Sequence, residues 1–256
     1  MNYMIETNQV CKDYHVGQTI IKANDNINLK INKNEFCVIV GPSGSGKTTL
    51  LNLLGGMDIP TSGQIIVDGF DISKYNDKQL TLYRRNSIGF VFQFYNLMNN
   101  LTAIDNVEIA SEICSSPLDG KDVLRQVGLE DRMNSFPSQL SGGEQQRVSI
   151  ARAIAKNPKI LLCDEPTGAL DYQTGKRILS LLHDLCKNLK KTVIVITHNS
   201  MITPMADHVV YVKNGTIVKE EYNEKPLPIE SIEWWFSWRG HLESISLVQL
   251  KKILQE

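Results

Sequence analysis

The stretch Glu35-Phe36-Cys37-Val38-Ile39-Val40, followed at once by Gly41-Pro42-Ser43-Gly44-Ser45-Gly46-Lys47-Thr48, decides the fold. A short apolar run bounded by turn residues predicts a strand that is buried on both faces. The eight residues after it match G-x-x-x-x-G-K-[ST], and residues 48–54 read as a helix stopped by two glycines. Strand, loop and helix in this order favour a phosphate-binding loop over a plain glycine-rich turn.

This loop predicts how a nucleotide is held. Its glycines let backbone N–H groups approach phosphate oxygens, and Lys47 should reach the β- and γ-phosphates. The hydroxyl of Thr48 should ligate Mg²⁺, and we also assign Thr49 to the nucleotide-binding set. The loop does not say which class of nucleotide hydrolase this is.

The rest of the chain alternates strands with helices. The pattern predicts strands at residues 5–10, 20–31, 64–67, 87–92, 159–163, 192–197, 209–213 and 216–219. It predicts helices at residues 103–114, 121–127, 144–155 and 174–189, the first three inside a helical insert at about 94–156. Strands alternating with helices imply a mainly parallel sheet, and Asn214-Gly215 predicts a hairpin.

Composition limits the partners. The 256 residues carry a formal net charge of −1, so no global field favours nucleic acid or an anionic membrane. The N-terminus lacks the order of a signal peptide, and no apolar stretch approaches the roughly 18 residues needed to span a bilayer. Five cysteines without Cys-x-x-Cys spacing favour reduced thiols over disulfides or a metal site. We expect a cytosolic or peripherally bound protein.

Two carboxylates end the apolar run at residues 160–163. Asp164 would hold Mg²⁺, and Glu165 could orient and deprotonate an attacking water. The alternative is a strand-ending turn before Pro166. Two weaker candidates also follow strands: Gln93 could touch Mg²⁺ or the water, and His198 could hydrogen-bond the γ-phosphate.

A second glycine-rich turn, Leu140-Ser141-Gly142-Gly143-Glu144-Gln145-Gln146-Arg147, leads into a helix expected to begin near Glu144. A small hydroxyl and bare backbone N–H groups at a helix start form an anion-binding surface. The chain has two such surfaces and one nucleotide-binding lysine. We therefore predict that the second surface serves a neighbour's nucleotide.

Two further residues have open roles. The ring of Tyr14 could stack on a purine, or Tyr14 could be a half-buried strand tyrosine. Asp171 could cap the next helix, lie at a subunit contact, or both.

Taken together, these motifs resemble the nucleotide-binding subunit of an ATP-binding cassette (ABC) transporter over residues 5–219. The order matches: aromatic residue Tyr14, Walker A 41–48, Q-loop Gln93, signature 140–145, Walker B 160–164 with catalytic Glu165, D-loop 168–171 and switch His198. The resemblance implies an α/β P-loop NTPase core with a mainly parallel sheet, an N-terminal antiparallel β subdomain and an inserted α-helical subdomain. It assigns residues 1–222 to this domain and 223–256 to a linker and tail.

The family implies an enzyme that hydrolyses ATP with Mg²⁺ as a head-to-tail dimer. Ser141 and Gly143 of one subunit would close on the ATP held by Lys47 of the other, and both sites of a homodimer should be competent. Hydrolysis would drive a membrane permease on a separate chain, which places this subunit on the inner face of the cell membrane. No nucleic acid partner is expected.

Local stretches at residues 90–97, 101–107, 136–139 and 167–171 look most like the lipoprotein-release and macrolide-export branch. That branch also includes antimicrobial-peptide resistance and mechanotransmission systems with FtsX- or MacB-type permeases. The alternatives are a soluble ABC ATPase, such as one of iron–sulfur cluster assembly, and an ATP-switched regulatory subunit of cell division. The absence of a long coiled coil and of paired cysteines argues against the DNA-repair members.

One feature departs from the family. All three tryptophans, Trp234, Trp235 and Trp238, follow a proline-containing linker and precede leucines at roughly helical spacing. Either this tail packs as a terminal helix on its own domain or dimer mate, or its aromatic residues meet the membrane interface or a permease.

Overall fold

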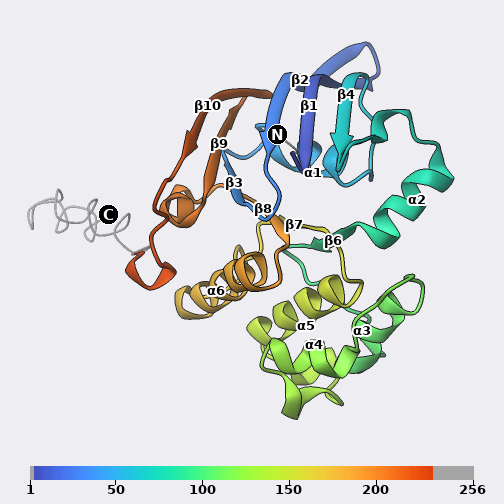
Figure 1. Ribbon diagram of the computed structural model, residues 1–256, viewed down its shortest axis with the longest axis vertical. Coiled ribbons are helices and arrows are strands. Elements are labelled where there is room, and N and C mark those ends of the chain that lie inside the picture. Colours follow the sequence, from blue (N-terminus) through green and yellow to red (C-terminus); the bar gives the residue numbers. More distant parts are fainter. Residues whose placement is uncertain (1–2, 233–256) are drawn as a thin grey trace, which may run out of the picture.

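The strand expected before the glycine-rich loop lies inside a six-stranded sheet with the order β10-β9-β3-β8-β7-β6 (Figure 1). The computed structural model describes residues 3–232. The strands of this sheet are β3 (Phe36–Val40), β6 (Ile88–Val91), β7 (Ile160–Asp164), β8 (Thr192–Thr197), β9 (His208–Lys213) and β10 (Thr216–Tyr222). All pairs are parallel except β9 with β10, so the prediction of a mainly parallel sheet is confirmed.

The middle of this sheet is buried on both faces, as the apolar sequence of β3 predicts. Cys37 and Ile39 point to a cluster with helix α1 (Lys47–Leu54). Phe36 and Val38 point the other way, to a cluster with helices α5 (Gly142–Ala155) and α6 (Tyr172–Asn188). Helices α1 and α5 therefore cover opposite faces of the parallel sheet.

A second sheet, in the order β2-β1-β4-β5, forms the antiparallel N-terminal part and lies at the top of Figure 1. Its strands are β1 (Ile5–Val16), β2 (Thr19–Ile31), β4 (Ser62–Val67) and β5 (Phe70–Asp71). Strand β1 runs six residues past the predicted end, because residues 12–16 pair with β2 after register shifts between Thr7 and Asp13. The predicted antiparallel subdomain is confirmed.

The helical insert is also present. It contains α3 (Ala103–Ser111), α4 (Gly120–Gln126) and α5, which pack together at the bottom of Figure 1. Short 3₁₀ turns connect the larger elements: η1 (Ile72–Lys74), η2 (Glu130–Arg132), η3 (Pro137–Gln139), η4 (Ser200–Met205) and η5 (Ile229–Ser231).

Helix α2 (Asp77–Asn86) was not predicted. Its mostly polar sequence buries only Leu80 and Tyr83, so its apolar stripe is too thin for a periodicity search. A signal was present in its first turn, where Asn76 and Gln79 form a reciprocal capping box.

The hairpin predicted at Asn214-Gly215 joins β9 to β10. Both residues have positive φ, 51° and 78°, as a two-residue type I′ turn requires. All five cysteines are free, and Cys37, Cys163 and Cys186 are buried, as expected for reduced thiols.

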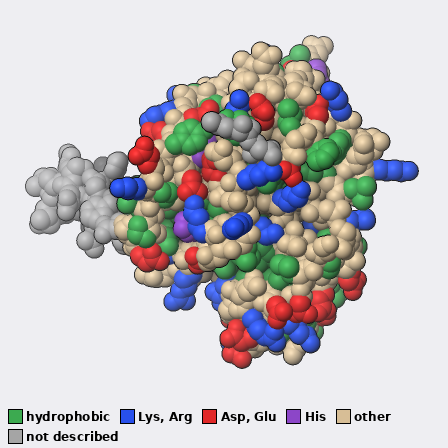
Figure 2. All heavy atoms as spheres, in the orientation of Figure 1, with side chains coloured by type: hydrophobic (Ala, Val, Ile, Leu, Met, Phe, Trp, Pro, Cys, Tyr) green, Lys and Arg blue, Asp and Glu red, His purple; other side chains and the backbone are tan. Residues whose placement is uncertain are grey.

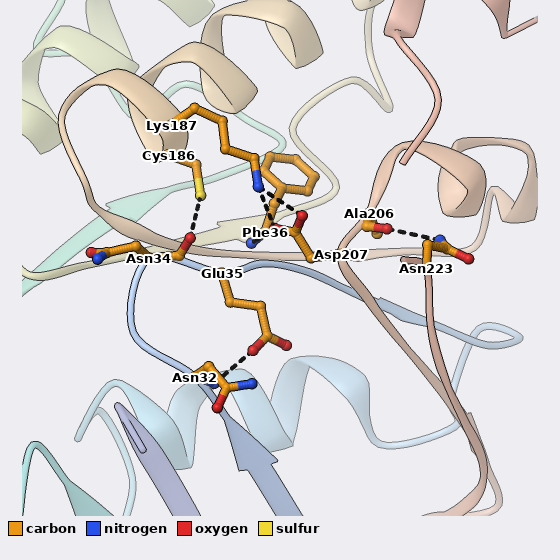
Figure 3. A network of polar contacts seen from close by, with 9 residues as sticks. All are labelled: Asn32, Asn34, Glu35, Phe36, Cys186, Lys187, Ala206, Asp207 and Asn223. Carbon is orange, nitrogen blue, oxygen red and sulfur yellow. Dashed lines mark hydrogen bonds and ion pairs between the residues drawn. The ribbon is translucent and has the colours of Figure 1, made fainter. Parts of the chain in front are cut away.

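A polar network fixes the amino end of β3 (Figure 3). Asp207 accepts hydrogen bonds from the backbone N–H of Phe36 and from Lys187 Nζ, both at 2.7 Å. Nearby, the amide of Asn223 donates to the carbonyl of Ala206 at 2.7 Å, and the Cys186 thiol lies 3.4 Å from the carbonyl of Asn34. The network ties the end of α6 and the residue after β10 to the centre of the sheet.

Basic and acidic side chains are both spread over the face shown in Figure 2, in keeping with the near-zero net charge. Within residues 3–232, no helix is long and apolar enough to cross a membrane. The tryptophans and leucines of the predicted tail fall in residues 233–256, outside the described part of the chain.

Candidate functional site

Four loops meet at the carboxyl edge of the parallel sheet. Strands β3, β6, β7 and β8 lead into the glycine-rich loop, Gln93, Asp164-Glu165 and His198 respectively. The register pairs Val40 with Thr197 and Asp164 with Ile196, so the ends of these strands are level. The fold therefore brings together at one edge the residues that the sequence distributes over 150 positions.

The glycine-rich loop is shaped by close backbone contacts. A Cβ on Gly46 would lie 2.2 Å from the carbonyl oxygen of Ala23, and one on Gly41 would lie 2.1 Å from that of Val212. Gly44 and Gly46 also adopt positive φ, 75° and 96°. The hydroxyl of Ser45 in the loop is buried without a hydrogen-bond partner. Glycines and an unpaired polar atom at a helix start fit an anion-binding cradle.

Lys47 folds over this loop. Its Nζ donates to the carbonyl oxygens of Gly41 at 2.8 Å and Pro42 at 2.9 Å, and the residue is only 7% exposed. Burial lowers the pKa of Lys47, while the charges of Glu165 and Asp164 act in the opposite direction. A cationic group is thus held at the mouth of the loop.

Asp164 ends β7 beside this lysine. Burial raises the pKa of Asp164, a hydrogen bond from Thr48 opposes that rise, and the nearby Glu165 charge adds to it. The hydroxyl of Thr48 and the carboxylate of Asp164 are oxygen donors of the kind that Mg²⁺ prefers. Residues 3–232 contain no group of three or more His, Cys, Asp or Glu side chains able to hold a metal ion. Thr48 and Asp164 would suit a magnesium ion, which proteins commonly bind through one or two carboxylates together with phosphate oxygens and water.

Glu165 is held by three donors. Its Oε1 accepts from the backbone N–H of His198 and lies 2.8 Å from His198 Nδ1, and its Oε2 accepts from Thr197 Oγ1 at 2.9 Å. Its backbone takes a left-handed conformation with φ of 46°, which is uncommon for a side-chain-bearing residue. The structure therefore brings the predicted Glu165 and His198 into contact. Thr197 was missed because a threonine inside an apolar strand reads as a β-former.

Gln93 lies next to the loop that follows Glu165. A Cβ on Gly168 would be 2.9 Å from Gln93 Nε2, so the two loops pack closely. The same loop borders a cavity of 260 Å³ that is lined by Glu165, Thr167, Gly168, Leu170, Tyr172, Thr197, His198 and Asn199.

The second glycine-rich turn forms the start of α5. Ser141 is the N-cap, and its Oγ accepts from the backbone N–H of Glu144, whose carboxylate accepts from Ser141 in return. The helix begins at Gly142, not near Glu144 as predicted, because this cap closes the first turn earlier. A Cβ on Gly143 would lie 2.3 Å from Thr174 Cγ2, so the helix start packs closely on α6.

The glycine-rich loop before α1 and the glycine-rich turn at the start of α5 lie apart within one chain. Ser141 is exposed and bonds to Glu144, whereas Lys47 bonds to its own loop. Their helices, α5 and α1, pack on opposite faces of the parallel sheet.

Tyr14 and Asp171 both have protein partners. The hydroxyl of Tyr14 donates to Asp58 at 2.8 Å, and Lys12 Nζ lies 5.0 Å from the centre of the Tyr14 ring. Tyr14 is 37% exposed. Asp171 is the N-cap of α6, as one of its two predicted roles required, and accepts from the backbone N–H of Thr174 at 3.1 Å.

One buried amide was not predicted from the sequence. Gln146 on α5 is fully buried and donates to the carbonyl oxygen of Pro166 at 2.9 Å and, more weakly, to that of Phe92 at 3.4 Å. It thus bridges the segments beside Glu165 and Gln93. The one sequence signal for Gln146 is its position in the second glycine-rich turn, two residues after Glu144.

Comparison with known proteins agrees with this geometry. Residues 24–168 match the family model described as ABC transporter. An ABC transporter ATP-binding protein of Methanocaldococcus jannaschii is 44% identical over 227 residues, covering 85% of this chain and 97% of the relative. The structure of that cassette as a dimer in a post-hydrolysis state with ADP and phosphate superposes with a TM-score of 0.78 at 42% identity, covering 86% of this chain and 98% of the other.

Two further relatives are longer than this chain. A putative ABC transporter ATP-binding protein of Mycoplasma pneumoniae is 43% identical over 235 residues, which are 91% of this chain but 50% of the relative. The macrolide export ATP-binding/permease protein MacB of Vibrio parahaemolyticus is 34% identical over 267 residues, 96% of this chain and 41% of the relative. The chain thus spans about half the length of these proteins.

A P-loop core with an antiparallel β subdomain and a helical insert defines the class as an ATP-binding cassette. The chain belongs to the ABC transporter family, as an ATP-binding subunit.

Proposed function

We propose that this chain hydrolyses ATP as a head-to-tail dimer and thereby drives a membrane permease on a separate chain. The observation that carries the hydrolytic part is the carboxylate of Glu165, held by Thr197 and His198 beside the buried Lys47. Three contacts hold this carboxylate in one orientation, as a general base requires.

Each residue of the site has a role in this proposal. The N–H groups of residues 41–48 and Lys47 bind the phosphates, Thr49 adds a contact, and Tyr14 stacks on the base. Glu165 takes the proton of the attacking water, and His198 bonds the γ-phosphate. Thr48, Asp164 and Gln93 would hold Mg²⁺, which supplies charge neutralisation at the phosphate oxygens when bound.

The dimer follows from the separation of the two glycine-rich turns. Because α1 and α5 cover opposite faces of the sheet, Ser141, Gly142, Gly143 and Glu144 serve the nucleotide of a second copy. Asp171, exposed at the start of α6, would lie at the same contact. The dimer of the M. jannaschii relative supports this arrangement.

The permease is proposed from the relatives. MacB carries an ATP-binding part and a permease in one protein, and this chain matches 41% of its length. We infer a partner of the same type on another chain, used for export, lipoprotein release, antimicrobial-peptide resistance or mechanotransmission, with this subunit on the inner face of the membrane. Co-purification of a membrane protein with the tagged chain tests this, and recovery of soluble partners alone would contradict it.

The hydrolytic proposal is tested by two variants. Glu165→Gln should lower kcat by at least about 100-fold while ATP still binds, because only proton transfer is removed. Lys47→Ala should weaken ATP binding itself. The measurements are steady-state phosphate release and equilibrium binding of ATP. A Glu165→Gln variant with near-normal turnover would remove the general-base assignment.

A further inference from the structure

Residues 223–232, named here the strap, link the sheet edge to the loop that carries His198. At its start, the side-chain amide of Asn223 donates to the carbonyl oxygen of Ala206 at 2.7 Å (Figure 3). The same amide donates to the carbonyl oxygen of Thr203 at 3.1 Å. Farther along, the backbone N–H of Leu227 donates to Pro204 at 2.8 Å. These acceptors lie in or next to η4, which begins two residues after His198. The first half of the strap is thus fixed to the segment behind the switch histidine.

The second half is fixed to the start of α6, beside which this red segment lies in Figure 1. Lys176 Nζ donates to the carbonyl oxygen of Glu230 at 3.0 Å, and the hydroxyl of Tyr172 donates to that of Ile232 at 3.3 Å. Ile229 and Ile232 are 7% and 4% exposed and belong to the same apolar cluster as residues of α6 and η4.

Helix α6 begins directly after the D-loop, residues 168–171. The strap therefore joins the D-loop and the His198 loop from behind, through the first turns of the elements that follow them. Tyr172 also lines the 260 Å³ cavity together with Glu165, Leu170 and His198. Each loop runs directly into an element that the strap contacts, α6 after the D-loop and η4 after His198.

We propose that the strap is a brace that sets the D-loop against the Glu165–His198 pair, with Tyr172 and Lys176 as positioning residues. The inference rests on the proposed ATPase function. It couples the C-terminal part of the chain to closure on a second copy and to hydrolysis.

The test uses the full chain with Tyr172→Phe and Lys176→Met combined, which removes both anchors and leaves Ile229 and Ile232 in place. Lys191→Met is the matched control, because it also removes a lysine hydrogen bond, 2.7 Å to Asn157, away from the strap. We measure kcat and KM for ATP, and ATP-driven dimerisation on a Glu165→Gln background by sedimentation. The brace predicts that kcat and the dimer association constant each fall at least about fivefold, with KM and the thermal unfolding midpoint unchanged. The control should behave as wild type.

Two outcomes of these measurements would overturn the brace. Values of kcat and dimerisation within about twofold of wild type would overturn the brace. If the double variant unfolds earlier, the single variants Tyr172→Phe and Lys176→Met decide, and a loss of kcat that only follows the unfolded fraction also overturns it. A wild-type chain without ATPase activity would instead contradict the proposed function, so the two failures are distinguishable.

Discussion

At the scale of single residues, the site places charge where folding alone would avoid it. Asp164 ends a buried strand, and Lys47 is 7% exposed. Burial favours the neutral form of each group. It therefore raises the pKa of Asp164 and lowers the pKa of Lys47. Charged groups held against desolvation are typical of sites that bind phosphate and cations.

Asp164→Asn should therefore stabilise the nucleotide-free protein while it removes Mg²⁺-dependent turnover. The pKa of Asp164 is raised on folding, so its ionised form destabilises the native state at neutral pH. We expect the free energy of unfolding at pH 7 to rise. Urea titration with and without Mg²⁺-ATP measures it.

The same variant has a defined pH dependence. A raised folded pKa means that the penalty is absent below the unfolded pKa and grows as pH rises through the folded one. The advantage of Asp164→Asn over wild type should thus shrink as pH falls from 7 toward the ordinary Asp pKa of about 3.9. An advantage that is constant over this range would show that ionisation of Asp164 is not its source.

Thr197 is predicted to position Glu165. Thr197→Val keeps the side-chain shape but loses the hydrogen bond to Oε2, and kcat should fall about tenfold with KM for ATP unchanged. Thr197→Ser restores a hydroxyl and should recover most of the rate. Equal rates for Val and Ser would contradict the assignment.

At the scale of elements, the sequence predicts those parts in which local and tertiary signals agree. The apolar run of β3 and the Asn214-Gly215 turn were predicted correctly, because burial on two faces and positive φ leave clear residue signatures. Helix α2 was missed because only two of its side chains are buried. Gln146 and Thr197 were missed because their partners lie on segments distant in the sequence, at Pro166 and Glu165.

The start of α5 combines a structural cap with the proposed contact to a second copy, and two substitutions separate these roles. Ser141→Ala removes the cap acceptor and should lower the free energy of unfolding by about 1 kcal/mol. Ser141→Asp keeps a cap acceptor but loses the hydroxyl donor to Glu144 and places two carboxylates together, so it should cost about as much stability as Ser141→Ala. Its charge faces the partner's phosphates in the proposed dimer, so it should abolish ATP-driven dimerisation and turnover. Normal turnover by Ser141→Asp would exclude a contact of this serine with nucleotide.

At the scale of the whole molecule, the two glycine-rich turns lie apart within one chain. The glycine-rich loop and the α5 turn belong to helices on opposite faces of one sheet, and that sheet is continuous through β3, β8 and β7. The sequence motifs predict that the two turns serve nucleotides of different copies. The strap could not be predicted from the sequence, because most of its hydrogen bonds are made to backbone carbonyl oxygens.

The C-terminal region should divide into two parts with different effects on stability. Residues 226–232 pack against the domain, since Ile229 and Ile232 are buried in its main core. Deleting 226–256 should lower the free energy of unfolding by about 3 kcal/mol or more relative to deleting 233–256, because two isoleucine side chains leave the core. The double substitution of Ile229 and Ile232 by serine in the full chain is the matched control and should reproduce the loss. Urea unfolding of the three proteins and wild type measures it. Equal stability of the two deletions would mean that the strap adds nothing to the fold, and the apolar contacts of Ile229 and Ile232 would have to be energetically neutral.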